Sequence, residues 1–341
     1  MSKPHHIAVI GAGMAGLSCA TALQQAGFQV SVFDKSRGPS GRMSTRRGAG
    51  WQCDHGAQYF TARDPHFRAE VALWELAGAA ARWIPVVHVF DGSGAPTLCR
   101  ASERFVGTPR MTAPAALLAA PLTLHCATAI TGVRRDGAGW RLKGQSENQS
   151  EGQFDDQFDD PSRGHYNAVV LAVPAPQAVP LLHPLSPGMA ALAAGAVMRG
   201  CWSMMLQFPA PLALAFDAAF VHQGPLRWIA RDSSKPGRDG GDTWLLHASA
   251  EWSDAHIELD AERVAAELLA AFVALGGAEP HSWSAHRWRY ASTDPALGAV
   301  CIWEAELSLG MCGDWLNGGT VEAAWLSGRA LAQRMISGQH R

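Results

Sequence analysis

The chain has 341 residues, of which 48% are hydrophobic and 17% are charged, and its formal net charge is -2. Such a composition is typical of a globular protein with a sizeable apolar core, and it excludes an intrinsically disordered chain. The chain has no basic excess, so its charge does not favour a nucleic-acid-binding protein. The length fits two domains, or one domain with a large inserted part.

The cysteines and the hydropathy of the chain indicate the cellular compartment in which the protein is expected. The 7 cysteines are scattered and none forms a C-x-x-C motif, so we interpret them as free thiols in a reducing compartment. The N-terminal apolar run is interrupted by glycines and passes into a glycine-rich motif, so we predict no export signal. No uncharged apolar stretch reaches about 18 residues, so no membrane span is predicted. We expect a cytoplasmic protein, and one without a metal site because no His or Cys pair has ligand spacing.

A glycine-rich loop near the N-terminus stands between a predicted strand and a predicted helix. Residues 7–10 form a short apolar run that is typical of a buried parallel strand. The loop GAGMAG, residues 11–16, follows at once and continues into a helical pattern that ends near Gly27. A second strand, 29–33, ends in Asp34. The motif G-x-G-x-x-G therefore has the β-α-β context of a dinucleotide-binding fold.

Each part of this motif has a physical role in holding a dinucleotide. Gly11 permits a tight turn, Gly13 lets the backbone approach a pyrophosphate, and Gly16 lets the helix pack close to the strand. The Asp34 carboxylate can accept hydrogen bonds from a ribose diol and would repel a 2′-phosphate. The basic loop that follows, which contains Arg42, can close over the pyrophosphate. The motif alone leaves open whether the dinucleotide is NAD or FAD.

Further elements follow from periodicity and capping signals. We predict a β-meander over 123–143 and a tryptophan-rich second domain from about 185 to 297. A helix is predicted to begin after the cap Asp260 and to end at Gly276-Gly277. The residues expected on its packed face are Val264, Leu268, Leu269, Phe272 and Val273. Other strands are predicted at 83–90, 168–173, 203–208, 226–230 and 244–249, and another helix at 112–120.

An acidic low-complexity segment interrupts this pattern at 144–165. It contains the near-duplicated pieces QSE and QFDD. We predict a mobile insertion at a hairpin tip, far from the chemistry.

A second glycine-rich loop occurs near the C-terminus, in CGDWLNGGTVEAAWLSGRALA, residues 312–332. The pattern predicts a strand end, a glycine turn and a helix, which together present backbone N–H groups to an anionic or polar group. An NAD enzyme with one Rossmann unit has no general need for it. FAD does, because its ribityl chain and the N1–C2=O edge of its ring need partners, and that edge becomes anionic on reduction. The two loops therefore favour FAD, with Asp314 as a ribityl acceptor and amides of Gly319, Thr320 and Val321 at the flavin edge.

Several stretches along the chain also carry a family resemblance. They are AVIGAGMAGLSCA, KSRGPSGRMSTRR, DHGAQYFTARD, LAVPAPQA, LHASAEWS, AHRWRYA and CGDW…GGTVEAAWLSG. Together they resemble the bacterial renalase-like flavoproteins, in the glutathione-reductase-type FAD clan that includes the monoamine oxidases. The resemblance implies an α/β fold, with a Rossmann-type FAD-binding domain and a second, mixed α+β substrate domain, as in p-hydroxybenzoate hydroxylase. Pro39-Ser40 departs from the clan, which more often has glycine at this place.

The resemblance also suggests how the chain is divided and what it binds. We expect residues 1–75, 107–183 and 299–341 to form the FAD-binding domain, and 76–106 and 184–298 the substrate domain. FAD is expected to be bound without a covalent link. The residues expected to contact it are Gly11, Ala12, Gly13, Met14, Ala15, Gly16, Asp34, Lys35, Arg42, Gln58, Tyr59, Ile130, Asp314, Gly319, Thr320 and Val321.

The implied activity is that of an oxidase of dihydronicotinamides. Members of the family oxidise 2- and 6-dihydro isomers of NAD(P) to NAD(P)+, with hydride transfer to FAD N5, and O2 reoxidises the flavin to give H2O2. Tyr59 and Trp288 are candidates to contact flavin and substrate, His247 to hydrogen-bond the carboxamide, and Arg289 to meet a phosphate or the flavin edge. Core packing is the alternative interpretation of Trp288 and His247, and an ion pair that of Arg289.

Three other functions stay open. An FAD-dependent amine oxidase is disfavoured for two reasons. Covalent members of that group attach the flavin through a Cys next to a Ser-Gly-Gly run, and no such run precedes Cys312. Many amine oxidases also use a lysine that holds a water near flavin N5, but this chain has only four lysines, and Lys235 is predicted to lie in a surface loop. A non-catalytic FAD-binding sensor would suit the acidic insertion. An NAD dehydrogenase would leave the C-terminal loop unexplained. The expected partners are a small-molecule substrate and O2, without nucleic acid or membrane.

Overall fold

The computed structural model describes residues 5–100, 102–137, 139–146 and 165–338, and the chain divides into two compact units. The first unit contains Met1–Gly41, Ala115–Val197 and Thr293–Arg341, and the second contains Arg42–Pro114 and Met198–Ser292. The predicted domain boundaries differ from these units: residues 42–75 and 107–114 fall in the second unit, and 184–197 and 293–298 in the first. The segment 42–75 belongs to the second unit because the turn after Asp54 has its hydrogen-bond partners there.

A six-stranded sheet forms the centre of the first unit. Its order is β18 (Ile302–Glu304), β19 (Leu309–Met311), β12 (Ala168–Leu171), β1 (His6–Ile10), β2 (Gln29–Phe33) and β9 (Thr123–His125). All neighbours are parallel except the antiparallel pair β18–β19. The central strands are buried apolar runs, as a parallel sheet covered on both faces requires. The predicted α/β fold is confirmed.

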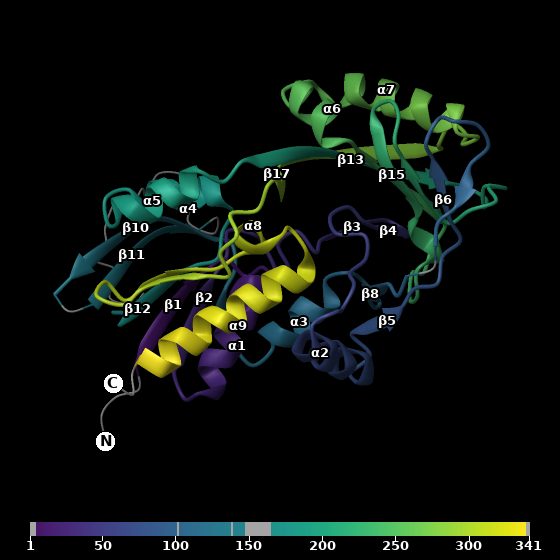
Figure 1. The fold of residues 1–341 in the computed structure, drawn as a ribbon. Coiled ribbons are helices and arrows are strands. Elements are labelled where there is room, and N and C mark those ends of the chain that lie inside the picture. The colour runs from purple at the N-terminus through teal and green to yellow at the C-terminus, as the bar shows by residue number, and fades with distance from the viewer. Residues whose placement is uncertain (1–4, 101, 138, 147–164, 339–341) are drawn as a thin grey trace. The chain divides into compact units, whose positions relative to one another are not determined.

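Helix α1 (Met14–Gln25) packs against helix α9 (Val321–Gly338), so the two ends of the chain lie side by side in this unit (Figure 1). A Cβ on Gly328 would collide with the backbone of Ala15 and would lie 2.9 Å from the amide nitrogen of Cys19, so only glycine allows this approach. The Ser18 hydroxyl donates to the carbonyl oxygen of Trp325 at 2.8 Å. The two predicted glycine loops, which begin these helices, therefore belong to one unit. Helices α4 (Ala175–Leu182), α5 (Pro187–Ala194) and α8 (Asp314–Asn317) complete it.

The predicted meander over 123–143 is wrong in its first strand, while its second and third strands form the expected antiparallel pair. Strand β9 pairs in parallel with β2, while β10 (Thr128–Asp136) and β11 (Gly139–Ser146) form a separate antiparallel ladder. Strand β9 is thus the edge strand of the parallel sheet, and β10 has β11 as its antiparallel partner. Residues 144–146 of the predicted insertion continue β11, and its residues 147–164 lie outside the described residues.

A seven-stranded sheet forms the second unit. Its order is β17 (Ser282–Thr293), β13 (Met198–Phe208), β16 (Asp242–Ala248), β15 (Leu226–Arg231), β14 (Ala218–Val221), β6 (Val87–Phe90) and β7 (Thr97–Leu98). Helix α6 (Ala250–Ala255) and helix α7 (Ala261–Ala274) lie along one face of this sheet (Figure 1). The predicted strands are confirmed in type, although the one expected at 83–90 begins only at Val87, after Pro85, which has no backbone N–H.

Helix α7 packs its apolar side chains into the core on one face of this sheet. The Asp260 side chain accepts the Arg263 amide and caps the helix, as predicted. Four of the five residues predicted on its packed face are buried, but Val273 is 41% exposed. The 100° step of a helix carries Val273 away from the sheet while Phe272 stays in the core. The sheet residues that pack on this side include Trp202, Met204, Leu206, Ile229, Trp244 and Leu246.

Shorter elements surround the sheet. The hairpin of β3 (Thr45–Gly48) and β4 (Trp51–Asp54) leads into the turn that ends at Tyr59. The others are α2 (Pro65–Leu76), β5 (Ala80–Arg82), β8 (Phe105–Gly107) and the 3-10 turn η2 (Asp232–Ser234). Helix α3 (Ala113–Ala119) begins at the last residues of the segment Arg42–Pro114, and most of it belongs to the first unit.

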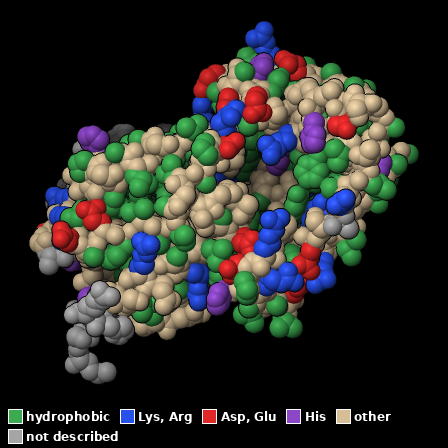
Figure 2. All heavy atoms as spheres, in the orientation of Figure 1, with side chains coloured by type: hydrophobic (Ala, Val, Ile, Leu, Met, Phe, Trp, Pro, Cys, Tyr) green, Lys and Arg blue, Asp and Glu red, His purple; other side chains and the backbone are tan. Residues whose placement is uncertain are grey.

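The cysteines, the hydropathy of the helices and the surface charge can be compared with the sequence predictions. All seven cysteines are free, as predicted. No helix in the described ranges has the length and apolar character needed to cross a membrane. On the face that Figure 2 shows, Lys and Arg side chains are mixed with Asp and Glu, which agrees with the near-neutral net charge.

Candidate active site

The N-terminal loop of the first unit has the geometry that a pyrophosphate needs. Gly11 has a φ of 110°, and a Cβ there would lie 2.5 Å from the carbonyl oxygen of Ala172. A Cβ on Gly16 would collide with the carbonyl oxygen of Gly11. Around Gly13, in contrast, nothing lies within 4 Å of the Cβ position. Two glycines thus serve the turn and the packing, while the third leaves space in which a ligand can approach the backbone at the start of α1.

Asp34 closes this loop from the end of β2. Its Oδ2 accepts the Ala12 amide at 2.7 Å and its Oδ1 accepts the Ser36 amide at 2.7 Å. Each carboxylate oxygen keeps a lone pair, so the group can still accept from a ribose hydroxyl. The Thr128 amide donates to the Asp34 carbonyl oxygen at 2.9 Å, which places the half-buried Ile130 on the adjoining strand. Lys35 is exposed beside Asp34. Contact of these residues with FAD stays a prediction.

Ser40 takes a backbone conformation that disfavours a side chain. Its φ is 131°, its amide donates to the Ala12 carbonyl oxygen at 3.0 Å, and it is buried. Glycine adopts positive φ without strain, so the backbone at this position favours glycine over serine. We expect Ser40→Gly to raise the free energy of unfolding by about 1 kcal/mol, measured by urea denaturation. Ser36→Gly, on the same loop, is the control, and equal or lower stability of Ser40→Gly would contradict the strain.

The C-terminal loop contains a short helix that the sequence pattern does not reveal. Helix α8 begins at Asp314, and the chain then turns through Gly318 and Gly319, with φ of 112° and 68°. The Thr320 hydroxyl oxygen accepts the Ala323 amide at 3.0 Å and caps α9. Residues Gly318 to Thr320 are exposed, so the first turn of α9 is open to a polar ligand. Asp314 is buried, and its predicted contact with the ribityl chain stays untested.

The second unit has a polar and aromatic sheet face opposite α7. Side chains alternate along a strand, so the partners of the buried core residues point the other way. We call this the imidazole face and define it by Ser203 of β13, Trp228 of β15, His247 of β16, and His286 and Trp288 of β17. Strand pairing sets His247 opposite both Ser203 and Trp228.

The carbonyl oxygen of His55 lies at the centre of this face. It accepts Ser203 Oγ at 2.8 Å and Trp288 Nε1 at 2.9 Å, and it lies 3.2 Å from Nε2 of His247. A carbonyl oxygen has two lone pairs, so three converging donors saturate it. Because the donors belong to three strands, they fix the turn after Asp54 on the imidazole face.

The two imidazoles of this face, His247 and His286, and that of His55 on the adjoining turn are neutral. Burial lowers the pKa of His55 to about 3, and the proximity of His286 and of the Arg46 guanidinium adds to the shift. Burial and Arg46 lower the pKa of His286 to about 4, and burial lowers the pKa of His247 to about 4. The His55 ring stacks on Trp288 with centroids 5.2 Å apart, and His286 meets Trp288 at 4.4 Å. The face therefore presents aromatic rings and neutral hydrogen-bonding groups.

These pKa values predict that the protein loses stability in mild acid. The native pKa of each ring lies below the ordinary value of 6.5, so between about pH 4 and 6.5 the unfolded chain binds more protons. Stability is then complete above pH 6.5 and falls as the pH drops towards 4. His247 alone makes the free energy of unfolding fall by about 1.4 kcal/mol for each pH unit in this range, and His247→Gln should remove this part of the pH dependence. Urea unfolding at several pH values between 4 and 6.5 gives the slope of the free energy of unfolding against pH. An equal slope in the wild type and in the variant would contradict the prediction.

The predicted catalytic residues do not all meet. Tyr59 lies against Trp228 and Trp83, with ring centroids at 5.5 and 6.4 Å, and the Arg104 guanidinium lies over its ring. His247, Trp288 and Tyr59 thus belong to the imidazole face or touch it. Arg289 does not, because it points to the other side of β17 and is paired with Glu258 at 2.5 Å.

Two predicted FAD contacts lie in the second unit. The Gln58 amide nitrogen donates to the carbonyl oxygens of Asp54 at 2.5 Å and Gly56 at 3.2 Å. Arg42 donates to the carbonyl oxygen of Ala291 at 3.1 Å. Both are thus engaged with the backbone of this unit, and their contact with FAD stays a prediction.

His55 and His286 are not among the residues predicted for the site. Both occur in stretches that carry the family resemblance, DHGAQYFTARD and AHRWRYA. The alternation of polar and aromatic residues at positions 284, 286 and 288 was the available signal for one polar face of a strand.

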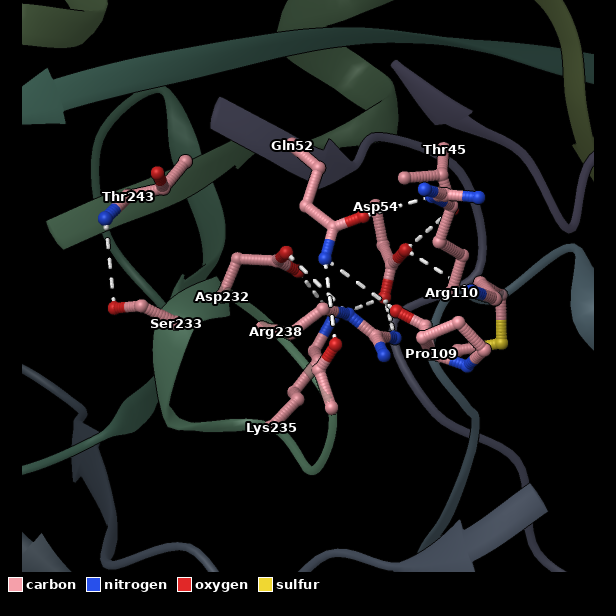
Figure 3. Close-up of polar contacts among 12 residues, drawn as sticks. Thr45, Gln52, Asp54, Pro109, Arg110, Asp232, Ser233, Lys235, Arg238 and Thr243 are labelled. Atoms are coloured by element: carbon pink, nitrogen blue, oxygen red, sulfur yellow. Dashed lines mark hydrogen bonds and ion pairs between the residues drawn. The ribbon is translucent and has the colours of Figure 1, made fainter. Parts of the chain in front are cut away.

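The predicted surface position of Lys235 is wrong. Its side chain is 0% exposed and lies among Asp54, Asp232 and Arg238 (Figure 3). Burial alone would lower the pKa of Lys235, but the charges of Asp232 and Asp54 outweigh it and raise the pKa above the ordinary value. Lys235 is therefore a paired cation in the interior of the second unit.

Comparison with known proteins now defines the class. Residues 9–73 match the NAD(P)-binding Rossmann-like domain, which agrees with the β-α-β unit that contains the first glycine loop and ends at Asp34. Residues 83–336 match the flavin containing amine oxidoreductases. The fold and the two glycine loops are those of an FAD-dependent oxidoreductase. Because the second match covers most of the chain, the chain belongs to the flavin containing amine oxidoreductase family, and the prediction of FAD is confirmed.

Solved structures of similar fold include cyclohexylamine oxidase from Brevibacterium oxydans IH-35A, with a TM-score of 0.74, 13% identity, and coverage of 99% of this chain and 100% of that chain. Wild-type putrescine oxidase bound to putrescine has a TM-score of 0.74 and 14% identity, covering 98% and 99%. Such identities establish the fold alone. L-amino-acid oxidase of Daboia russelii is 46% identical over 57 residues, which is 16% of this chain and 11% of that enzyme. The matched stretch thus spans about a tenth of this relative.

Proposed function

We propose that this chain is a renalase-like FAD-dependent oxidase that converts 2- and 6-dihydro isomers of NAD(P) to NAD(P)+ with formation of H2O2. FAD is held by the first unit, and the imidazole face of the second unit binds the dihydropyridine ring. Bound FAD supplies the hydride acceptor and its reoxidation by O2. The protein supplies orientation, exclusion of water and hydrogen bonds to the carboxamide.

The charge state of the imidazole face carries this proposal. His55, His247 and His286 are neutral, and the nearby Arg46 is a cation whose Nη2 lies 3.4 Å from Nδ1 of His286. Among the described residues, the carboxylate that acts on His55 is Asp54, and it is already paired with Lys235 and Arg238. A protonated amine at this face would therefore meet the Arg46 cation and a carboxylate that is already paired. A neutral, planar dihydropyridine can stack on Trp288 and hydrogen-bond an imidazole.

The individual roles follow from position. Trp288 offers a ring face and is fixed through its own N–H to the His55 carbonyl oxygen. His247 and Tyr59 flank Trp228 and provide polar groups at the face. No general base is needed, because the product of hydride removal is already the nicotinamide cation. Arg289 is assigned no role, since Glu258 engages it.

The experiment is a comparison of substrates under air. Borohydride-reduced NAD, which is a mixture of dihydro isomers, clean 4-dihydro NADH, a set of amines and a set of L-amino acids are each incubated with the FAD-loaded protein. We expect O2 consumption, H2O2 and NAD+ with the mixture alone. Turnover of an amine or amino acid, with none of the mixture, would overturn the proposal.

Amine oxidation is the second candidate, and membership of the flavin containing amine oxidoreductase family favours it. For an amino acid, Arg46 could pair with the carboxylate. This candidate predicts turnover in the amine or L-amino-acid arms of the same experiment.

A further inference from the structure

Four charged side chains are buried together beneath the turn that runs from Asp54 to Tyr59. We call Asp54, Asp232, Lys235 and Arg238 the charge cluster (Figure 3). Lys235 Nζ lies 2.7 Å from Asp232 Oδ1 and 3.1 Å from Asp54 Oδ2, and Arg238 Nη2 lies 2.5 Å from Asp54 Oδ2. The four side chains are 0 to 1% exposed. At neutral pH two positive and two negative charges make the cluster neutral as a whole, although burial and the charge of Asp54 raise the pKa of Asp232 to about 6.

Stability alone is a poor explanation for this cluster. Removing ions from water costs several kcal/mol each, and apolar side chains of similar volume often stabilise a core as well as a buried ion pair does. The cluster is also imperfect, because Asp232 Oδ2 and Arg238 Nε have no hydrogen-bond partner and lie 3.8 Å apart. A buried ionic group that adds little stability is best explained by what it holds in place.

The cluster is joined to the turn at two points. Asp54 is the first residue of the turn, and its Oδ1 also accepts the Thr45 hydroxyl at 2.6 Å and the Met111 amide at 3.2 Å. Lys235 Nζ donates to Gln58 Oε1 at 3.3 Å. Gln58 in turn donates from its amide nitrogen to the carbonyl oxygens of Asp54 and Gly56. Lys235 therefore binds both ends of the turn, directly at Asp54 and through the Gln58 side chain.

The turn held in this way carries groups of the imidazole face. His55 offers the carbonyl oxygen that accepts Trp288 and Ser203, and its ring stacks on Trp288. Tyr59 follows Gln58 directly and packs on Trp228. A displacement of the turn would thus disturb the orientation of Trp288 and the burial of His55 together.

We propose that Lys235 is a positioning residue, which fixes the Asp54–Tyr59 turn through Asp54 and Gln58 and so holds His55 and Trp288 in the geometry that receives the substrate ring. The inference rests on the proposed function for the identity of that substrate. The positioning itself is a property of the protein without substrate and can be measured without turnover.

The variants are chosen to separate positioning from charge balance. Asp232→Asn keeps Lys235 with both of its contacts to the turn. Asp232→Asn with Lys235→Met leaves Asp54 and Arg238 as a neutral pair, but the link to Gln58 is lost. Gln58→Leu leaves all four charges in place and removes only the side chain that connects Lys235 to the turn.

The readout is the protonation of the His55 ring at about pH 5.5, followed by NMR of protein with 15N-labelled histidine and assigned with His55→Asn. In the wild type the ring is neutral, because its pKa is about 3. A ring released from Trp288 returns towards the ordinary 6.5 and is largely protonated. We expect the double variant and Gln58→Leu to show protonated His55, and Asp232→Asn to show the neutral ring.

A folded double variant with a neutral His55 would overturn the proposal, and so would a neutral His55 in Gln58→Leu if the double variant does not fold. With 2- and 6-dihydro-NAD as substrates, the double variant is expected to lose roughly 10- to 100-fold in kcat/KM relative to Asp232→Asn. Equal kcat/KM in these two variants would also count against it. Absence of turnover in every protein, the wild type included, would reject the proposed function and leave the His55 result intact.

Discussion

Replacing Gly328 by alanine is expected to destabilise the first unit and to release FAD. The new Cβ would collide with the backbone carbonyl oxygen of Ala15 and approach the amide of Cys19, so no side-chain rotation can relieve the contact. Helix α9 would have to move away from α1, at a cost of about 3 kcal/mol. Both glycine loops begin these two helices, so their separation should weaken FAD retention. Urea denaturation and the flavin absorbance that remains after gel filtration measure the two effects.

Gly338→Ala is the matched control, because it makes the same change on the same helix at a position with nothing within 4 Å. It should alter the free energy of unfolding by no more than about 1 kcal/mol and leave FAD bound. If both variants behave alike, close packing of α1 and α9 is not what unites the two loops.

Replacing Trp288 by leucine is expected to reduce kcat/KM for the dihydronicotinamide by roughly 10- to 100-fold, with little loss of FAD. Leucine cannot donate to the His55 carbonyl oxygen, and it offers no ring face to His55 or to the substrate. Steady-state kinetics of O2 consumption give the change, and near-ultraviolet circular dichroism reports whether the aromatic packing survives.

Trp283→Leu provides the comparison, since it is the same substitution on the same strand. Trp283 is 36% exposed and points to the other side of β17. Its kcat/KM should stay within about twofold of wild type. A similar loss in both variants would show that Trp288 acts through the stability of the strand and not through the imidazole face.

The parts of the fold that were predicted well depend on short-range pattern. The strand before Gly11, the loop to Gly16 and the strand that ends at Asp34 lie within one β-α-β unit, and each glycine has the conformation or contact that its spacing indicates. The cap at Asp260 is equally local, because its partner is only three residues away. Such features are visible in a window of sequence.

The parts that were missed depend on contacts between distant segments. The stretch around Lys235 is polar and contains Pro and Gly, which indicates a surface loop, yet Asp54, 181 residues away, holds it in the interior. The position of His55 depends in the same way on Trp288 at the far end of the chain. The ion pair of Arg289 likewise depends on Glu258, which lies 31 residues earlier in the chain and outside β17.

The most direct test of the account is reduction of the bound flavin without oxygen. The FAD-loaded protein is mixed anaerobically with one compound at a time, and the absorbance of the flavin is followed. The compounds are the purified 2-dihydro, 6-dihydro and 4-dihydro isomers of NAD, a set of amines and a set of L-amino acids. We predict rapid bleaching by the 2- and 6-dihydro isomers and by none of the others. Bleaching by amines or amino acids alone would instead show that the imidazole face serves amine oxidation.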